Sequence, residues 1–232
     1  VIATKWNPLL RTADSIRKTI RKRLECLSPF PIDLHQVHFP ASFSSVEAEM
    51  DALADLIDER LIRAAGVSNY SASSMRRAHR RLVDRGFSLA SNQVKYSLLD
   101  RRIEHNGVLE TARELGISII AYSPLEMGLL TGKFHRDPGL LESRPFVRRL
   151  RLGRLMRKSR PLIEVLERLA AGRGVTPSQI ALNWLVHFHG DTVVTIPGAS
   201  KPKHAAESAG AMTFTLSSDE LSEIDRVSQE CQ

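Results

Sequence analysis

The chain has 232 residues, 42% of them hydrophobic, and its 33 Lys and Arg against 26 Asp and Glu give a formal net charge of +7. This composition excludes a disordered chain and supplies enough apolar residues for a sizeable core. The two cysteines, Cys26 and Cys231, exclude a disulfide framework, and no Cys or His spacing typical of a metal site occurs. No apolar run reaches the roughly 18 residues of a membrane span, and the opening VIATKWNP forms no signal peptide.

We therefore predict a soluble, cytoplasmic protein with free thiols and without a metal or a membrane segment. The basic excess allows nucleic acid, an acidic surface or a phosphorylated small molecule as a partner, and the place of the charge decides among them.

Short apolar, β-branched runs alternate with amphipathic helical patterns along the chain. The first strand, 1–4, is followed by a helix that Thr12 or Asp14 caps and that runs to residue 27. Later helices show a capping box of Ser44 with Glu47, a Thr176-Pro177 start, and a second capping box of Ser217 with Glu220. Further strands are predicted at 32–40, 62–68, 89–96, 117–122 and 193–196, and further helices at 44–61, 71–86, 103–115, 162–171, from 177, 202–210 and 217–228.

The strand ends recur about every 30 residues, the length of a βαβ unit. This alternation predicts an α/β fold with a parallel sheet buried on both faces. A (β/α)8 TIM barrel needs eight strands, so we expect one domain over 1–232 that holds about six of the eight βα units and lacks the N-terminal ones. An open doubly wound sheet could be complete with six strands, but its GxGxxG turn is absent. The segment 126–160, rich in Gly, Arg and Pro, is predicted to be a functional flap or partly mobile.

Polar residues stand where the strands give way to loops. Each has an ordinary structural role open to it, such as turn former or solvated strand end. Together at one barrel mouth, where such barrels keep their chemistry, they favour a functional site. They are Lys5, His38, Ser68, Asn69, Gln93, Tyr122, Ser123 and Gly198 to Ser200.

Eight segments of the chain resemble those of the aldo-keto reductases, and they occur in the family's order. They are VIATK, DLHQVHFP, GVSNYS, SNQVKYS, IIAYSPL, LTGKF, TPSQIALNWL and TIPGASKPKHAAESAG. The branch it is most similar to includes plant and bacterial plastid-type members and the potassium-channel β subunits. The resemblance implies NADP(H)-dependent reduction of aldehydes or ketones to alcohols by hydride transfer, with a small-molecule carbonyl substrate, and a plastid location if the source is a plant.

The same resemblance assigns Lys5 and His38 to the family's catalytic group of Tyr, Lys, His and Asp. An ammonium beside the proton-donating phenol lowers the phenol's pKa, and the imidazole orients the carbonyl and donates to its oxygen. The family's Asp and Tyr are expected upstream of Val1, and Tyr70, Tyr96 and Tyr122 do not match that tyrosine. Activity is therefore expected of a longer parent protein and expected to be impaired in this chain alone.

The resemblance also implies the cofactor contacts. Ser68, Asn69 and Gln93 hold the nicotinamide carboxamide, for which their donors and acceptors are suited, and Tyr122 stacks on the ring. The ribose and pyrophosphate meet Ser123, Pro124, Leu125, Met127 and Gly128; Lys133 pairs with phosphate; Gly198, Ser200 and Lys201 meet the 2′-phosphate; His204, Glu207 and Ser208 meet the adenine. Arg144, one of seven arginines in the flap with Arg148, Arg149, Arg151, Arg154, Arg157 and Arg160, clamps a phosphate.

Two other functions are compatible with parts of the sequence. A cofactor-binding, redox-sensing module resembling the channel β subunits would bind NADPH and turn over slowly. A basic nucleic-acid binder is the third possibility, but no aromatic stacking pattern or recognition helix accompanies the arginines. We therefore predict no nucleic-acid partner and leave the oligomeric state open.

Overall fold

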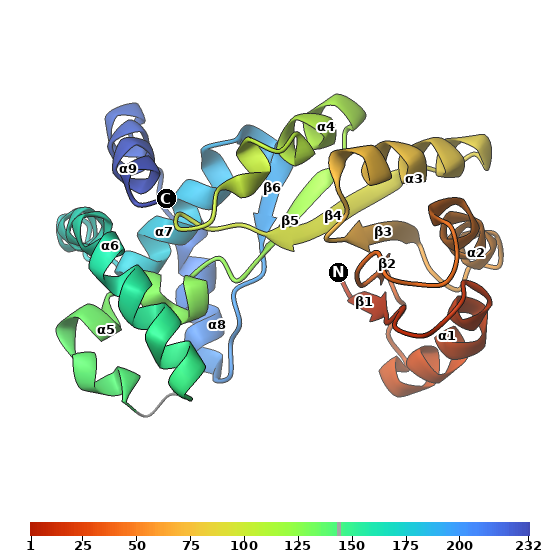
Figure 1. Ribbon diagram of the computed structural model, residues 1–232, viewed down its shortest axis with the longest axis horizontal. Helices are drawn as coiled ribbons and strands as arrows, with labels where there is room; N and C mark the ends of the chain where they lie inside the picture. Colours follow the sequence, from red (N-terminus) through yellow and green to blue (C-terminus); the bar gives the residue numbers. More distant parts are fainter. Residues whose placement is uncertain (143–144) are drawn as a thin grey trace. The chain divides into compact units, whose positions relative to one another are not determined.

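The computed structural model describes residues 1–142 and 145–232. The chain divides into two compact units: unit 1 comprises Val1–Val94 and Ile103–Ile120, and unit 2 comprises Lys95–Arg102 and Ala121–Gln232. Figure 1 draws both units with their helices and strands labelled. The predicted single domain over 1–232 stays a prediction.

Unit 1 is a run of βα units. Its strands β1 to β4 pair in that order, all parallel, with Ala3 opposite Leu34, Leu34 opposite Ala64, and Ser68 opposite Gln93. Because the strands are parallel, their carboxyl ends lie along one edge of the sheet. The elements are β1 (Ala3–Trp6), α1 (Asp14–Leu27), β2 (Leu34–Val37), α2 (Val46–Asp58), β3 (Ala64–Ser68), α3 (Ala72–Asp84), β4 (Leu89–Lys95, to Val94 in this unit), α4 (Val108–Leu115) and the start of β5 (Ser118–Tyr122).

The core of unit 1 follows from the apolar pattern. All four residues of β2 are buried, as expected of a parallel strand covered on both faces. Trp6 of β1, Ile16 of α1 and Leu53 of α2 are fully buried. Helices α1 and α2 pack side by side (Figure 1). Gly66 allows the closest strand approach, since a Cβ there would lie 2.5 Å from Ser91 Oγ.

The predicted capping box of Ser44 and Glu47 is wrong by one residue. Ser45 is the N-cap of α2, and its side chain accepts from the backbone N–H of Ala48. Ser44 Oγ instead accepts from the backbone N–H of Ala13, 2.9 Å away, so this hydroxyl ties the start of α1 to the loop before α2.

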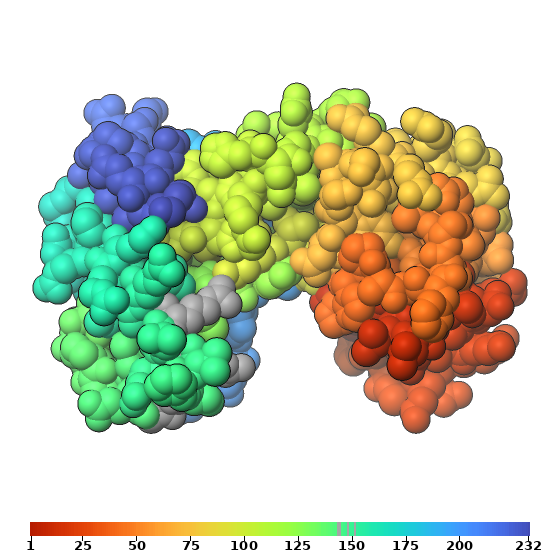
Figure 2. All heavy atoms as spheres, viewed as in Figure 1, coloured from red at the N-terminus to blue at the C-terminus, as the bar shows by residue number. Residues whose placement is uncertain are grey.

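Unit 2 holds the end of β5, the strand β6 and the remaining helices. The backbone N–H of Ile196 donates to Ala121 O at 3.1 Å beside these strands, and Trp184, Phe134 and Ile180 are fully buried. Helices α6 and α9 pack against each other (Figures 1 and 2) and are joined by an Arg168–Glu223 ion pair of 2.6 Å. The elements are η2 (Glu126–Thr131), α5 (Lys133–Arg136), η3 (Pro138–Leu141), α6 (Phe146–Ala171), α7 (Pro177–His187), η4 (Gly190–Thr192), β6 (Val193–Thr195), α8 (Pro202–Ala209), η5 (Gly210–Met212) and α9 (Ser218–Glu230).

Both capping signals predicted for unit 2 are confirmed. Thr176 forms a capping box with Gln179 at the start of α7, and Ser217 forms one with Glu220 at the start of α9. The start of α6 is different from the prediction, because the helix begins at Phe146 within the predicted flap and continues through Pro161. Its first half is rich in Leu and Arg, which favour helix, and burial of Leu152, Leu162 and Leu166 holds it on both sides of the proline. No helix in the described ranges is both long and apolar enough to cross a membrane.

Candidate functional site

The predicted site residues of unit 1 lie at the carboxyl ends of its parallel strands. Lys5 is in β1 opposite Gln36 of β2, and His38 directly follows β2, its backbone N–H donating to Trp6 O at 3.0 Å. Ser68 ends β3 opposite Gln93 of β4, and both are buried. The parallel sheet therefore brings these residues to one edge, as the strand-end argument predicts.

A chain of hydrogen bonds joins three of these strand ends. Ser68 Oγ donates to Gln93 O at 2.8 Å, and the Asn69 backbone N–H donates to the same oxygen at 2.9 Å. The Asn69 side-chain amide lies 3.2 Å from Ser68 Oγ and 3.4 Å from His38 O. Asn69 has φ +60°, a left-handed conformation that Asn tolerates better than most residues. This geometry fixes the direction of an exposed amide beside His38.

The charge of Lys5 acts on His38. Burial lowers the pKa of Lys5. Partial burial lowers the pKa of His38, and the positive charge of Lys5 lowers it further. The imidazole is therefore neutral near pH 7, with one N–H to donate and no competing positive charge of its own.

Two of the three tyrosines are engaged elsewhere. The hydroxyl of Tyr70 donates to the buried carboxylate of Glu49, and burial followed by that charge raises the pKa of Tyr70. Tyr96 Oη lies 2.7 Å from His189 Nε2. A phenol with a raised pKa holds its proton, so Tyr70 is poorly suited to act as an activated donor.

Unit 2 contains a cavity of about 750 Å³ that collects most of the predicted cofactor residues. Its volume lies within the roughly 300–1,000 Å³ typical of small-molecule sites. The predicted residues that line it are Ser123, Pro124, Leu125, Met127, Gly128, Lys133, Gly198, Ser200, His204, Glu207 and Ser208. The loop after β5, the start of η2 and the start of α8 thus converge, although they are about 70 residues apart in sequence.

The loop after β5 has an unusual backbone. Ser123, Glu126, Met127 and Gly128 have φ values of +54°, +42°, +54° and +89°. Such conformations cost free energy in non-glycine residues and concentrate at functional sites. The Thr131 hydroxyl donates to Gly128 O at 2.8 Å and so supports the loop from η2.

Lys133 gives this cavity its free positive charge. A Cβ at Gly128 would lie 2.9 Å from Lys133 Nζ, so the glycine leaves room for the ammonium above the loop. Within the described residues, no carboxylate lies at ion-pair distance from Lys133, whereas Arg136 pairs with Glu167 at 2.6 Å. Lys133 Nζ lies over the Phe134 ring, 5.0 Å from its centroid. An ammonium without a carboxylate partner, serine hydroxyls and a close backbone approach suit a phosphate-bearing ligand.

Two of the residues predicted to meet the adenine, His204 and Glu207, have hydrogen-bond partners at the cavity. Glu207 accepts from Thr176 Oγ1 at 2.9 Å, which links α8 to the N-cap of α7. Ser200 Oγ lies 3.5 Å from His204 Nδ1. The cavity is therefore bounded on this side by two helix starts.

Six predicted cofactor residues are not among the lining of this cavity. Ser68, Asn69 and Gln93 belong to unit 1. Tyr122 ends β5 and is half-buried, and Lys201 is the exposed N-cap of α8. Arg144 lies outside the described residues, as do the side chains of Arg148 and Arg151. Arg149, Arg154 and Arg157 line a different cavity of unit 2, of about 890 Å³, and Arg160 pairs with Glu164 at 3.3 Å.

The sequence reasoning missed two groups of residues. Thr131, Arg136 and Thr176 to Ser178 also line the 750 Å³ cavity. In the sequence, Thr176-Pro177 was noted only as the start of a helix. Lys95, Asp100 and Glu126 form an ionic cluster in which Lys95 Nζ lies 2.8 Å from Glu126 and 3.1 Å from Asp100. The feature of the sequence that could have indicated this cluster is Glu126, the one charged residue in the otherwise apolar or neutral SPLEMG segment.

No group of three or more His, Cys, Asp or Glu side chains that could hold a metal occurs in the described part of the chain. The predicted site residues carry amides, hydroxyls, lysine ammonium groups, the imidazoles of His38 and His204, and the carboxylate of Glu207.

Comparison with known proteins gives consistent matches over nearly the whole chain. The profile of the Aldo/keto reductase family matches residues 1–229. "Pyridoxal reductase, chloroplastic" of Arabidopsis thaliana is 32% identical over 235 residues, covering 99% of this chain and 62% of that protein. "Aldo-keto reductase str7" of Strobilurus tenacellus is 31% identical, covering 94% and 64%, and "Probable pyridoxal reductase 2" of Schizosaccharomyces pombe is 30% identical, covering 92% and 65%.

Among solved structures, a crystal structure of the thermostable aldo-keto reductase Tm1743 with the inhibitor epalrestat matches with a TM-score of 0.75 and 29% identity. The match covers 97% of this chain and 70% of that one. It confirms the predicted α/β class and the (β/α)8 TIM-barrel fold, with six of its strands in the residues described here. The chain spans between 62% and 65% of the length of the three curated relatives.

Proposed function

Because the chain belongs to the aldo/keto reductase family, we propose that it is part of an NADPH-dependent oxidoreductase that reduces aldehydes or ketones to alcohols. The observation that carries the proposal is the cavity of unit 2, in which residues assigned to the cofactor by resemblance meet from the β5 loop and from α8. Residues so far apart in sequence would not be expected to line one cavity by chance.

The cavity suits the phosphates and adenosine of the dinucleotide. Lys133 has no carboxylate partner there and supplies a positive charge beside a glycine that permits close approach. Ser200 lines the cavity and Lys201 stands next to it in sequence, and together they favour the 2′-phosphate of NADPH over the bare hydroxyl of NADH. Glu207 is already oriented by Thr176 and can accept from an adenine amino group.

The polar strand ends of unit 1 are proposed to serve the reacting groups. Ser68, Asn69 and Gln93 present amide and hydroxyl groups that match a carboxamide, and their mutual hydrogen bonds fix the orientation. When bound, the nicotinamide supplies the hydride that reaches the carbonyl carbon.

His38 is neutral at working pH, so its N–H can donate to the carbonyl oxygen and stabilise the negative charge that develops there. Lys5 holds a positive charge beside it, which lowers the pKa of any acid that protonates the alkoxide. Phe39 lies 5.3 Å from the His38 ring, centroid to centroid, and offers an apolar wall. With two relatives named as pyridoxal reductases, we assign aromatic aldehydes, pyridoxal among them, as the substrate class.

The test is titration of the chain with NADPH, followed by the cofactor's fluorescence. Lys133→Gln is expected to weaken binding by about tenfold or more, since a charge-assisted hydrogen bond contributes roughly 1.5–3 kcal/mol. Lys203→Gln is the matched control, because Lys203 is an exposed lysine of α8 outside the cavity. Equal affinity in the two variants, or no saturable binding at all, contradicts the cofactor assignment.

Turnover is measured in the full-length protein, because activity is expected to be impaired in this chain alone; the substrates are pyridoxal and other aromatic aldehydes, and the readout is the loss of NADPH absorbance. Lys5→Met and His38→Gln are expected to lower kcat and leave NADPH affinity within about twofold, because they act on the carbonyl and not on the cofactor cavity. Tight NADPH binding with no reduction of any aldehyde contradicts the reductase and favours the redox-sensing module.

A further inference from the structure

A buried polar network in unit 1 joins the loop that follows His38 to the turn that carries Asn69. The hydroxyl of Ser42, in the loop after β2, donates to Glu49 Oε1 at 2.6 Å. The other oxygen of the same carboxylate accepts from the hydroxyl of Tyr70, the residue after Asn69. Helix α2 therefore holds both strand-end loops through one side chain.

The network continues into β4, next to Gln93. The backbone N–H of Tyr70 donates to Asn92 Oδ1 at 3.4 Å, and the Asn92 side-chain amide donates to Tyr70 O at 3.0 Å. Glu49, Tyr70 and Asn92 are all buried, and α2 packs against both α1 and α3. Because Asn92 holds the backbone of Tyr70, the network can be cut at the phenol without releasing the turn that carries Asn69.

The loop after β2 is short and compact, so its anchor at Ser42 restricts His38. The backbone N–H of Ala41 donates to Phe39 O at 3.0 Å, and Pro40 between them has a restricted φ. A displacement of Ser42 is therefore transmitted through these intervening residues to the His38 imidazole.

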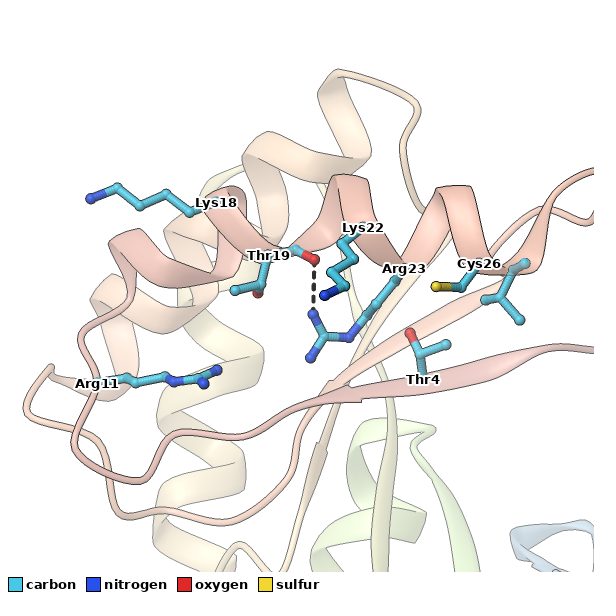
Figure 3. Close-up of a pocket in the computed structure, with 8 residues that line it drawn as sticks. Thr4, Arg11, Lys18, Thr19, Lys22, Arg23 and Cys26 are labelled. Atoms are coloured by element: carbon cyan, nitrogen blue, oxygen red, sulfur yellow. Dashed lines mark hydrogen bonds between the residues drawn. The ribbon is translucent and has the colours of Figure 1, made fainter.

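Glu49 is an acidic residue in a buried position without an ion-pair partner. By contrast, Lys18 of α1 is exposed and extends away from Thr4 of β1 (Figure 3), and Arg77 pairs with Glu47 at 2.9 Å. Among the described side chains, no cation lies at ion-pair distance from Glu49, and burial raises the pKa of its carboxyl. Burial of an acid is costly, and an apolar side chain would serve the core at a lower cost, so the fold alone does not explain the carboxyl.

We propose that Glu49 is a positioning residue of the proposed reductase, on which this inference rests. Through Ser42 and Tyr70 it sets the place of the His38 imidazole relative to Asn69, and so the place of the substrate carbonyl relative to the nicotinamide. Such placement matters because a misplacement of about 1 Å can cost on the order of a hundredfold in rate. Glu49 acts through other residues, so its removal is expected to change kcat rather than affinity.

The network can be removed without leaving a buried polar group unpaired. In the double variant Glu49→Met with Tyr70→Phe, both partners of one hydrogen bond become apolar side chains of similar shape, an exchange that is nearly neutral for stability. The Ser42 hydroxyl can then donate to Ser44 O, 3.2 Å away. A network that serves only the fold is therefore dispensable in this variant.

Turnover of pyridoxal with NADPH is measured in the full-length protein, together with urea unfolding. The double variant is expected to lose about tenfold or more in kcat, with an unchanged urea midpoint and with the KM for pyridoxal and the Kd for NADPH within about twofold. Glu49→Gln is expected to keep most of kcat, since its amide can accept from Tyr70 and donate to Ser42. Glu47→Gln is the matched control, because the Glu47 side chain is 41% exposed and pairs with Arg77; it is expected to leave every value unchanged.

The position of His38 is read independently of turnover from the NMR resonance of its imidazole in the same protein, assigned by its absence in His38→Gln. This resonance is expected to shift in the double variant and in Ser42→Ala, and to stay in place in Glu47→Gln.

A double variant with the kcat of the wild type, or with an unmoved His38 resonance, overturns the inference and identifies the network as a purely structural one. A loss of NADPH affinity as large as the loss of kcat also overturns it. A wild-type protein that reduces no aldehyde contradicts the proposed function instead, and the resonance then still decides whether the network sets the position of His38.

Discussion

The ionic cluster of Lys95, Asp100 and Glu126, next to the loop after β5, gives the sharpest prediction. Lys95 Nζ lies 2.9 Å and 2.8 Å from the two carboxylate oxygens of Glu126, whose side chain is only 2% exposed, while that of Lys95 is 18% exposed. Glu126 belongs to the left-handed loop that lines the 750 Å³ cavity. The pair therefore fixes the backbone of that loop as well as neutralising a buried charge.

Lys95→Met removes the cation and leaves the carboxylate buried. Breaking a buried ion pair in this way costs about 3–5 kcal/mol, and the partial exposure of Lys95 favours the lower end, about 3 kcal/mol in the free energy of unfolding of unit 2. Glu126→Gln is expected to cost less, because the amide keeps the shape and one hydrogen bond with Lys95. In the double variant, the coupling between the two positions is expected to be about 2 kcal/mol.

Urea unfolding followed by Trp184 fluorescence reports on unit 2 when all variants carry Trp6→Phe, since Trp6 belongs to unit 1. Arg226→Met is the matched control: Arg226 pairs with Glu230 at 2.9 Å, but their side chains are 64% and 61% exposed. Such a surface pair is worth at most about 1 kcal/mol. NADPH affinity, measured in the same variants, is expected to fall with Lys95→Met because the loop loses its anchor. If Lys95→Met costs no more than Arg226→Met, or if the two cluster variants are additive, the reasoning is refuted.

Three further predictions concern other parts of the chain. Burial, and then the charge of Arg23, lower the pKa of His35 from its ordinary 6.5 to about 4. The stability that neutral His35 contributes is therefore present above about pH 6.5 and is lost as the pH falls toward 4. The loss amounts to at most about 3 kcal/mol in the free energy of unfolding. Unit 1 unfolding, followed by Trp6 fluorescence with Trp184→Phe, is expected to lose that part of its acid sensitivity in His35→Gln, and an unchanged pH profile contradicts the assignment. Gly66→Ala places a Cβ 2.5 Å from Ser91 Oγ and 2.9 Å from Gln36 Cγ. It is expected to destabilise unit 1 by about 1–3 kcal/mol, and Ser91→Gly is expected to restore part of that loss. No change in urea unfolding would show that the strands can move apart to accept the methyl group. Gly128→Ala combines φ +89° with a Cβ 2.9 Å from Lys133 Nζ and is expected to weaken NADPH binding. The control is Gly153→Ala, a helical position with no atom within 4 Å of the added Cβ, which is expected to leave the NADPH titration unchanged. Equal titration curves for the two variants refute the role of Gly128.

The sequence alone determined the succession of strands and helices and the class of fold. Strand propensity and helix capping depend on residues close together in sequence. The strand β3, the Thr176 cap, the capping box at Ser217 and the polar residue at each strand end could therefore all be predicted. Because parallel strands share the direction of their carboxyl ends, the meeting of Lys5, His38 and Ser68 along one edge of unit 1 followed as well.

Only the tertiary structure decided features that depend on residues distant in sequence. The passage of α6 through Pro161 depends on burial against other elements, which outweighs the local effect of proline. The Lys95–Glu126 pair joins residues 31 positions apart. Charge pairing is a property of distances in space, and no local pattern in the chain records those distances.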